Sequence, residues 1–243
     1  MTQLSLSATN APSSQSHQRP LPAGHVDLLD FEALRKLLPV TRRTVVAGQT
    51  LFRAGQPFRA LYLVHAGFFK TCITAEDGRE RTTGFPIRGD LLGMESIGTD
   101  TYACDAVALD AGEVWELPYP PVLAAGQHLP ALQARLNMAL ASLLRHERAW
   151  ALALGTLGAE ARVALFLLDI AARQQSIGFS DRRLLLRMTR AEIGSFLGLQ
   201  LETVARGLSH LAARGAIAVR RREIELLDSD LLHTLAGRGG RAH

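Results

Sequence analysis

Hydrogen-bonding side chains gather near the start of a helix predicted within residues 188–206, MTRAEIGSFLGLQLETVAR. Thr189 and Glu192 have the spacing of a capping box, and Gly198 supplies a tight turn between two helices. The apolar spacing predicts that the second helix buries Leu201, Val204 and Leu208. The side chains expected to face outward are Gln200, Glu202, Thr203, Ala205 and Arg206. A recognition helix contacts base edges in the major groove with such a cluster, whereas the alternative interpretation is an ordinary helical hairpin.

A basic hairpin is predicted directly after this second helix. Gly215 ends the helix, and the alternating runs 216–219 and 223–227 flank the three arginines Arg220, Arg221 and Arg222. Arginines at a hairpin tip can lie along phosphates, although alone they would indicate only a solvated turn. Their position after a recognition-like helix favours a winged DNA-binding module. The candidate contacts to the DNA backbone are Thr189, Gln200, Thr203, Arg220, Arg221 and Arg222.

The charge of the chain is concentrated in the same region. The net charge is +4, and residues 180–243 hold 11 arginines against 7 acidic residues, whereas residues 1–179 are balanced at 16 of each sign. All of the excess positive charge therefore lies with the helix-turn-helix, as in a DNA-binding module joined to a neutral domain. With 243 residues and 47% hydrophobic residues, the chain has the length for two domains.

The chain lacks the features of a membrane or secreted protein. No apolar run reaches the roughly 18 residues of a membrane span, and residues 1–25 lack an apolar signal core, so a flexible tail is expected there. Cys72 and Cys104 are too few for a disulfide framework. These features predict a cytoplasmic location.

Short strands are predicted from about Val40 to Pro118. Glycines at 48, 55, 67, 78, 84, 89, 93 and 98 have the spacing of an antiparallel sandwich, and Asp77-Gly78 is a hairpin signal. Sandwiches of this kind commonly enclose a ligand pocket.

A long helix is predicted from about Leu129 to Leu157. Steps of three and four residues define a seam of Leu136, Leu140, Leu143, Glu147, Trp150 and Leu154. This spacing is typical of pairing with a second chain, and the alternative is a helix packed on its own sandwich. Glu147 interrupts the seam, so we expect it either to weaken dimerisation or to be neutralised by Arg145 and Arg148.

The order of these parts resembles the CRP/FNR superfamily of bacterial transcription regulators, most closely its FNR branch. The segments that carry the resemblance are AGQTLFRAG (47–55), LYLVHAG (61–67), TTGFPIRGDLLGMESIG (82–98) and MTRAEIGSFLGLQLETVARGL (188–208). The resemblance covers about residues 28–237 and implies an α+β fold with an antiparallel β-sandwich, or jelly roll, resembling a cyclic-nucleotide-binding domain. The implied divisions are a tail (1–25), the sensor sandwich (26–125), a dimerisation helix (126–158), a winged helix-turn-helix (159–237) and a second tail (238–243).

The resemblance also implies roles for individual residues. Glu202, Ala205 and Arg206 occupy the base-reading motif of the family, in which glutamate and arginine contact the G·C pair of a TTGAT half-site. Ala205 replaces the serine of that motif, and Leu201 stands where the cAMP-responsive branch has a further arginine. The segment from Ile73 to Glu80 matches the family's contact with RNA polymerase. The candidate residues there are Thr74, Glu76, Asp77, Gly78 and Arg79.

No cofactor and no metal site are predicted. The resemblance places a nucleotide-binding turn at Gly93-Met94-Glu95 and a pair that binds the cyclic phosphate at about Tyr102-Ala103, and neither position has the family's residues. An iron–sulfur cluster of the FNR type needs four thiolates, and Trp115 stands at the position of the ligand in the sandwich. His65, His128 and His146 have no metal spacing, while a haem held by a cysteine or histidine and a thiol switch both remain open.

No set of nucleophile, base or metal ligands indicates an enzyme. The sequence therefore predicts a homodimeric regulator that binds double-stranded DNA and RNA polymerase, with a link to oxygen or redox state implied by the resemblance. The alternatives are a regulator responding to another small ligand and a ligand-binding module acting on a partner protein.

Overall fold

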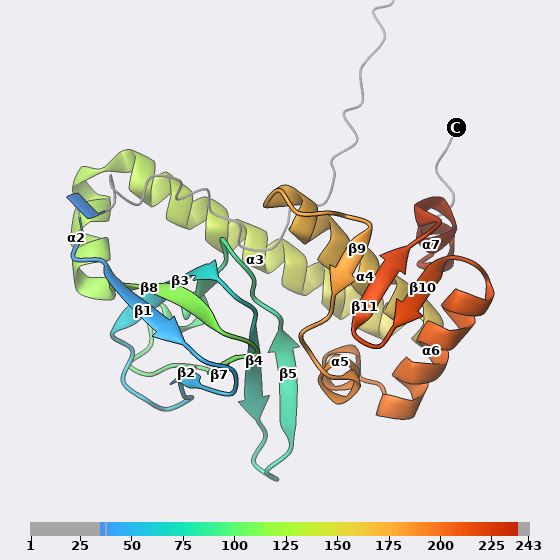
Figure 1. Cartoon of the computed structure of the whole chain (residues 1–243). Helices are drawn as coiled ribbons and strands as arrows, with labels where there is room; N and C mark the ends of the chain where they lie inside the picture. Colours follow the sequence, from blue (N-terminus) through green and yellow to red (C-terminus); the bar gives the residue numbers. More distant parts are fainter. Residues whose placement is uncertain (1–34, 37, 238–243) are drawn as a thin grey trace, which may run out of the picture.

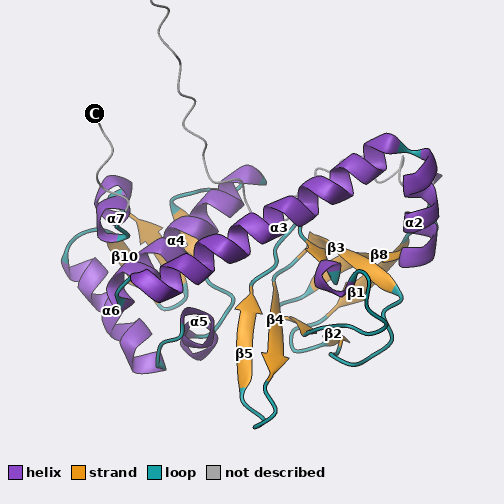
Figure 2. Ribbon diagram, turned by 180° about the vertical axis from the view of Figure 1, so that it is seen from behind, coloured by secondary structure: helices purple, strands orange, loops and turns teal. Residues whose placement is uncertain are grey.

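The computed structural model describes residues 35–36 and 38–237 (Figure 1). The expected tails and the expected start of the sandwich at residue 26 lie outside the described residues. A β-sandwich and a helical part with a small sheet lie side by side, and helix α3 (Pro130–Thr156) runs along both (Figure 2).

The sandwich consists of two antiparallel sheets of four strands each. The first has the order β1-β8-β3-β6, formed by Thr41–Val45, Gly112–Pro118, Ala60–Ala66 and Leu91–Leu92. The second has the order β2-β7-β4-β5, formed by Thr50–Phe52, Asp105–Ala108, Phe69–Thr74 and Glu80–Gly84. A single 3₁₀ turn, η1 (Met94–Ser96), follows β6. The antiparallel sandwich predicted from the glycine spacing is confirmed, and Gly78 turns the β4–β5 hairpin with a φ of 81°.

The long predicted helix is present and begins at a proline. A shorter helix, α2 (Tyr119–His128), precedes α3, and Leu129 between them has an extended φ of −125°. Pro130 has no N–H group and disfavours helical geometry in the residue before it, so the two helices are separate. Among the described helices, none is long and apolar enough to cross a membrane.

Two residues of the predicted dimer seam lie inside the chain. Leu136 packs into the core between α3 and the sandwich, and the Trp150 ring lies 4.8 Å from that of Phe196 in the C-terminal core. The prediction that Leu136 and Trp150 face a second chain is wrong, because steps of three and four also suit a helix covering its own domains. The other seam residues comprise three half-buried leucines and one exposed carboxylate, namely Leu140, Leu143, Leu154 and Glu147.

The C-terminal part is a helical core with a three-stranded sheet of order β10-β11-β9. Its elements are α4 (Ala159–Ser176), β9 (Arg183–Leu185), α5 (Arg190–Leu197), α6 (Leu201–Ala213), β10 (Ile217–Arg220), β11 (Glu223–Leu226) and α7 (Ser229–Leu235). Phe85, which follows β5, packs its ring against those of Phe166 in α4 and Phe196 in α5, with centroids 5.8 and 5.5 Å away. The sandwich and the helix-turn-helix therefore share apolar contacts.

Candidate nucleic-acid interface

Local hydrogen bonds fix the turn between α5 and α6. Thr189 and Glu192 form the predicted capping box: each side chain bonds the other residue's backbone N–H, at 3.2 and 2.7 Å. Gly198 ends α5 in the left-handed conformation, with a φ of 64°. A Cβ on Gly194 would lie only 2.5 Å from the carbonyl oxygen of Leu199, so a side chain at residue 194 would push the two helices apart. Small residues and a cap thus hold α6 at a set angle to α5.

Helix α6 presents a mostly polar face to solvent. Val204 and Leu208 are buried, whereas Glu202, Ala205 and Arg206 are exposed. Gln200 is also exposed, and the half-buried Thr203 hydroxyl accepts a hydrogen bond from Arg206 Nη2 at 3.3 Å. The side chains predicted to face outward thus share the first two turns of one helix.

Leu201 differs from its prediction. It is the first residue of α6 and is 45% exposed, although the apolar spacing predicted that it would be buried. The spacing of apolar residues alone assigned Leu201 to the core. The first turn of α6 extends beyond the hydrophobic core that covers Val204, so Leu201 stays exposed. This residue adds an apolar group to the face that carries Glu202 and Arg206.

The predicted wing is a tight hairpin. Strands β10 and β11 pair from Ile217↔Leu226 to Arg220↔Glu223. Arg221 adopts a positive φ of 58°, and it is the only described non-glycine residue with a positive φ. Arg220, Arg221 and Arg222 are all exposed. The three cations predicted to contact phosphates therefore project from one turn.

Arg190 joins the wing to the helix-turn-helix and was missed by the sequence analysis. Its guanidinium donates a hydrogen bond to the carbonyl oxygen of Arg221 at 3.0 Å. Burial and the neighbouring charge of Arg222 lower the pKa of Arg190 below its usual value. Arg190 and Arg221 are 31 residues apart, so the sequence gives no local sign of this contact. The position of Arg190 directly after the capping residue Thr189 was the only clue to its role.

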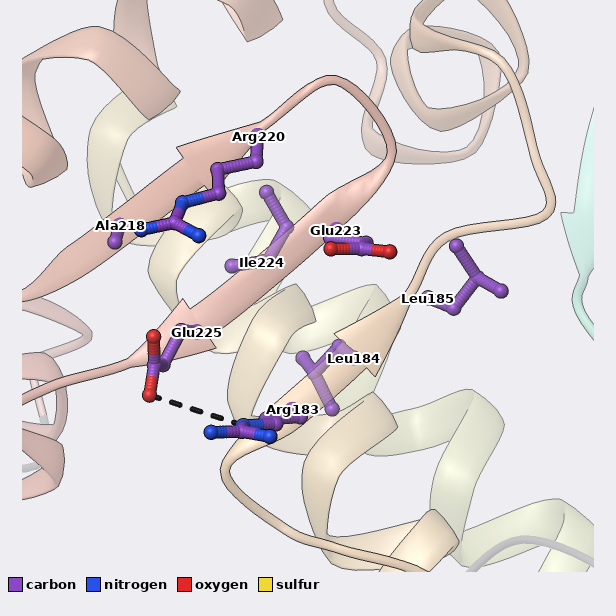
Figure 3. A pocket seen from close by; sticks show the side chains of 8 residues that line it. All are labelled: Arg183, Leu184, Leu185, Ala218, Arg220, Glu223, Ile224 and Glu225. Atoms are coloured by element: carbon purple, nitrogen blue, oxygen red, sulfur yellow. Dashed lines mark ion pairs between the residues drawn. The ribbon is translucent and has the colours of Figure 1, made fainter.

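A groove lies on the outer face of the wing sheet, and Figure 3 shows the side chains that line it. It has a volume of about 370 Å³ and is lined by residues 183–185, 218, 220 and 223–225. Glu223 and Glu225 lie in it, and Glu225 is 3.9 Å from Arg183. Arg183 and Arg220 also line the groove, so its two carboxylates face two guanidinium groups and it has no excess positive charge for nucleic acid.

The β4–β5 hairpin is attached to α5. Lys70 of β4 lies 2.9 Å from Glu80 and 3.3 Å from Glu192, and the Thr82 N–H donates to Ser195 Oγ at 2.9 Å. Burial alone would raise the pKa of Glu192, but its bonds with Thr189 and the charge of Lys70 lower it. The candidate polymerase contacts at the hairpin tip are exposed, namely Thr74, Glu76, Asp77, Gly78 and Arg79.

A buried ion pair forms a second link between the two parts. Arg173 of α4 is 5% exposed and donates to the Asp90 carboxylate at 2.5 Å and to the carbonyl oxygen of Phe85 at 2.9 Å. Asp90 also accepts from the N–H of Ile87 at 2.8 Å. Helix α4 is thereby bonded to the loop that follows β5.

Aromatic side chains pack around Tyr102 inside the sandwich. The Tyr102 ring stacks on Phe52 with centroids 4.0 Å apart, and its hydroxyl donates to the carbonyl oxygen of Ala60 at 2.8 Å. Tyr102 stands at the position of the phosphate-binding pair, and it offers a buried ring with a committed hydroxyl instead of a cation. The residues present do not fit a cyclic phosphate.

The two cysteines do not fit an iron–sulfur cluster of the FNR type. They supply two thiols where four are needed, and both are buried. Burial raises the pKa of the Cys72 thiol to about 11, and burial together with the Glu95 carboxylate raises that of Cys104. Both side chains are therefore protonated at neutral pH and poor nucleophiles.

Comparisons with known proteins agree with this architecture. A sequence profile of the cyclic nucleotide-binding domain matches residues 42–127, and one of the Crp-like helix-turn-helix domain matches residues 161–235. The chain is 35% identical over 196 residues to the fumarate nitrate reduction regulatory protein of Klebsiella oxytoca, covering 81% of this chain and 78% of that protein. It is also 35% identical to the transcriptional activator protein anr of Pseudomonas aeruginosa, over 80% of each chain. This chain belongs to the CRP/FNR family of transcription regulators.

A solved structure supports the same assignment. FixK2 from Bradyrhizobium japonicum superposes with a TM-score of 0.74 at 28% identity, over 81% of this chain and 96% of that one. The α+β fold predicted from the sequence is confirmed. The chain is accordingly a DNA-binding transcription regulator and not an enzyme.

Proposed function

We propose that the protein binds a palindrome close to TTGAT-N4-ATCAA as a homodimer in the cytoplasm. The observation that carries this proposal is the exposed pair of Glu202 and Arg206, one turn apart on α6 above the buried Val204. Arginine donates a fork to the O6 and N7 atoms of guanine, and glutamate accepts from the N4 amino group of cytosine. One G·C pair in each half-site would thus engage both charged side chains.

The proposed dimer forms along α3. Three large apolar side chains of this helix are exposed in the single chain: Met138 at 61%, Leu144 at 56% and Leu152 at 67%. Covering them with a second α3 removes apolar surface from water, and two-fold symmetry then presents two recognition helices to a palindrome.

Glu147 is the regulatory element of this proposed interface. It lies three residues after Leu144 on α3 and is exposed, and desolvation together with the nearby Glu95 carboxylate raises its pKa. Two such carboxylates approaching across a symmetric interface would repel each other. We assign to Glu147 the weakening of the dimer, so that a second signal can control assembly.

The names of the relatives, which include a fumarate nitrate reduction regulatory protein, support a link to oxygen or redox state. The residues present do not support a four-thiolate cluster or a cyclic nucleotide as the sensing group. The signal is therefore assigned to another group or ligand acting on the sandwich.

Quantitative binding tests the proposal directly. The purified protein is titrated with the palindrome and with a scrambled duplex at one salt concentration, under reducing and then oxidising conditions. We expect a preference for the palindrome, and a change of that preference with redox state supports the proposed signal. Equal affinity for both duplexes in both conditions would overturn the proposed site.

A further inference from the structure

Helix α5 is held by both α3 and the sandwich. The ring of Phe196 in α5 lies 4.8 Å from that of Trp150 in α3 and 5.5 Å from that of Phe85, which follows β5. Strand β5 and α5 lie side by side (Figure 1), and the Thr82 N–H of β5 donates to Ser195 Oγ at 2.9 Å. The first helix of the helix-turn-helix therefore contacts two elements outside its own domain.

Three ion pairs among the described residues cross from the sandwich to the C-terminal part. Each has one charge on either side, and no side chain among them is more than 40% exposed: Lys70 with Glu192 at 3.3 Å, Asp90 with Arg173 at 2.5 Å and Asp110 with Arg187 at 3.2 Å. Apolar burial has no preferred direction, whereas bonds between charged groups do. The ion pairs therefore specify how the C-terminal part is oriented on the sandwich.

The chain connection leaves this orientation to the contacts. Two residues, Leu157 and Gly158, separate the end of α3 from the start of α4. Glycine has no Cβ and adopts a wide range of backbone angles, so this connection does not impose one angle between α3 and α4. The angle between α3 and the helix-turn-helix is consequently set by the packing around Phe196 and by the ion pairs.

In a two-fold dimer along α3, this orientation determines a distance. If each helix-turn-helix has one orientation relative to α3, the two recognition helices have one separation and one relative rotation. One base pair more or less between the half-sites changes the separation by about 3.4 Å and the rotation by about 35°. A dimer that follows such a change must turn each helix-turn-helix on its sandwich, which stretches the ion pairs.

We propose that Lys70 and Arg187 select the spacing between the two half-sites, so that the dimer prefers a palindrome with an N4 spacer. This inference rests on the proposed function, because it requires a dimer on a palindrome. Both are positioning residues that need not touch DNA. Lys70 acts through Glu192, which caps α5, and Arg187 precedes α5 and acts through Asp110 in the turn between β7 and β8.

Palindromes that differ only in spacer length test this role. The full-length protein is titrated at fixed salt with duplexes that carry the same half-sites separated by N3, N4 or N5. The measured quantity is the ratio of the dissociation constant for the N3 or N5 duplex to that for the N4 duplex. We expect a ratio of about 10 for the wild type, which corresponds to breaking one or two bonds of the interface.

Two variants remove the positioning charges and keep the length of the side chain. Lys70→Met and Arg187→Met should each lower the spacer ratio to about 3, and the double variant should bring it close to about 1. Lys70→Arg keeps the charge and should restore the wild-type ratio. Arg43→Met is the matched control: Arg43 pairs with Glu116 at 2.9 Å within one sheet of the sandwich, so its loss should leave the ratio unchanged.

The ratio distinguishes positioning from stability. A variant that is merely less stable loses affinity for all three duplexes in proportion, so its spacer ratio stays that of the wild type. An unchanged ratio in the double variant therefore overturns the role of Lys70 and Arg187, and so does an equal fall of the ratio in Arg43→Met.

The wild type alone separates this inference from the proposed function. If it binds all three spacers equally but prefers them to a scrambled duplex, the spacing selection fails and the proposed half-site stands. If it binds no palindrome better than the scrambled duplex, the proposed site fails and the spacing selection fails with it.

Discussion

Removal of the Asp90 carboxylate should destabilise the protein strongly. In Asp90→Ala the guanidinium of Arg173, which is 5% exposed, loses the carboxylate 2.5 Å away and keeps the Phe85 carbonyl and Asp169 at 3.9 Å. Breaking a buried ion pair on one side leaves an uncompensated charge and costs about 3–5 kcal/mol of unfolding free energy. Because the Phe85 carbonyl still accepts a hydrogen bond, we expect the lower end, about 3 kcal/mol.

Denaturant unfolding followed by circular dichroism measures this loss, and calorimetry reports whether the two parts still unfold together. Asp77→Ala is the matched control: this aspartate pairs with Arg79 on the exposed hairpin tip and should leave the transition midpoint nearly unchanged.

A double variant separates charge burial from packing. Asp90→Leu combined with Arg173→Met removes both charges and should recover part of the lost stability, although the Ile87 N–H and the Phe85 carbonyl lose their side-chain partners. A loss below about 1 kcal/mol in Asp90→Ala, or a double variant no more stable than the single one, would refute the reasoning.

Four further perturbations address the DNA site, the dimer and the helix junction. Arg206→Ala should weaken binding to the palindrome by about 1–3 kcal/mol and relax the choice at the G·C pair; unchanged specificity across duplexes varied at that pair would show that α6 is wrongly placed. Arg221→Ala should weaken palindrome and scrambled duplex equally and lower the salt slope by about 1, and a loss confined to the palindrome would contradict a phosphate contact. Glu147→Leu should lower the dimer dissociation constant in sedimentation experiments, and no tightening would remove Glu147 from the interface. Burial lowers the pKa of His146 below its ordinary 6.5 despite the nearby Asp169, so the folded protein disfavours the proton and loses stability as the pH falls below about 6.5. His146→Gln should flatten this loss of stability at low pH. A pH profile of unfolding free energy identical to that of the wild type would contradict the reasoning.

The helix-turn-helix was predictable because local rules determine it. The capping box of Thr189 and Glu192 joins residues three apart, and Gly198 supplies the left-handed residue of the turn. Leu201 was mispredicted because apolar spacing identifies a helix face but not where the underlying core ends. Val204 meets that core and Leu201 extends beyond it, which only the packed structure reveals.

The dimer seam illustrates the same limit on a larger scale. Steps of three and four residues predicted the extent of α3 closely, but they do not say what covers each face. Leu136 and Trp150 are buried by this chain's own domains, and the large exposed side chains Met138, Leu144 and Leu152 lie elsewhere on the helix. The spacing of apolar residues therefore predicts that one face of α3 is covered. Whether this chain or a second chain covers it depends on contacts between residues distant in sequence.

The contacts between the sandwich and α5 have no local signal at all. Lys70 and Glu192, and likewise Thr82 and Ser195, are more than 100 residues apart in the chain. They nevertheless bond the two strands of the β4–β5 hairpin to the first helix of the helix-turn-helix. Glu192 also caps α5, so one carboxylate takes part both in the cap and in the pair with Lys70. The hairpin of the sandwich and the helix that positions the DNA-contacting surface are thus joined by direct contacts between side chains and backbone.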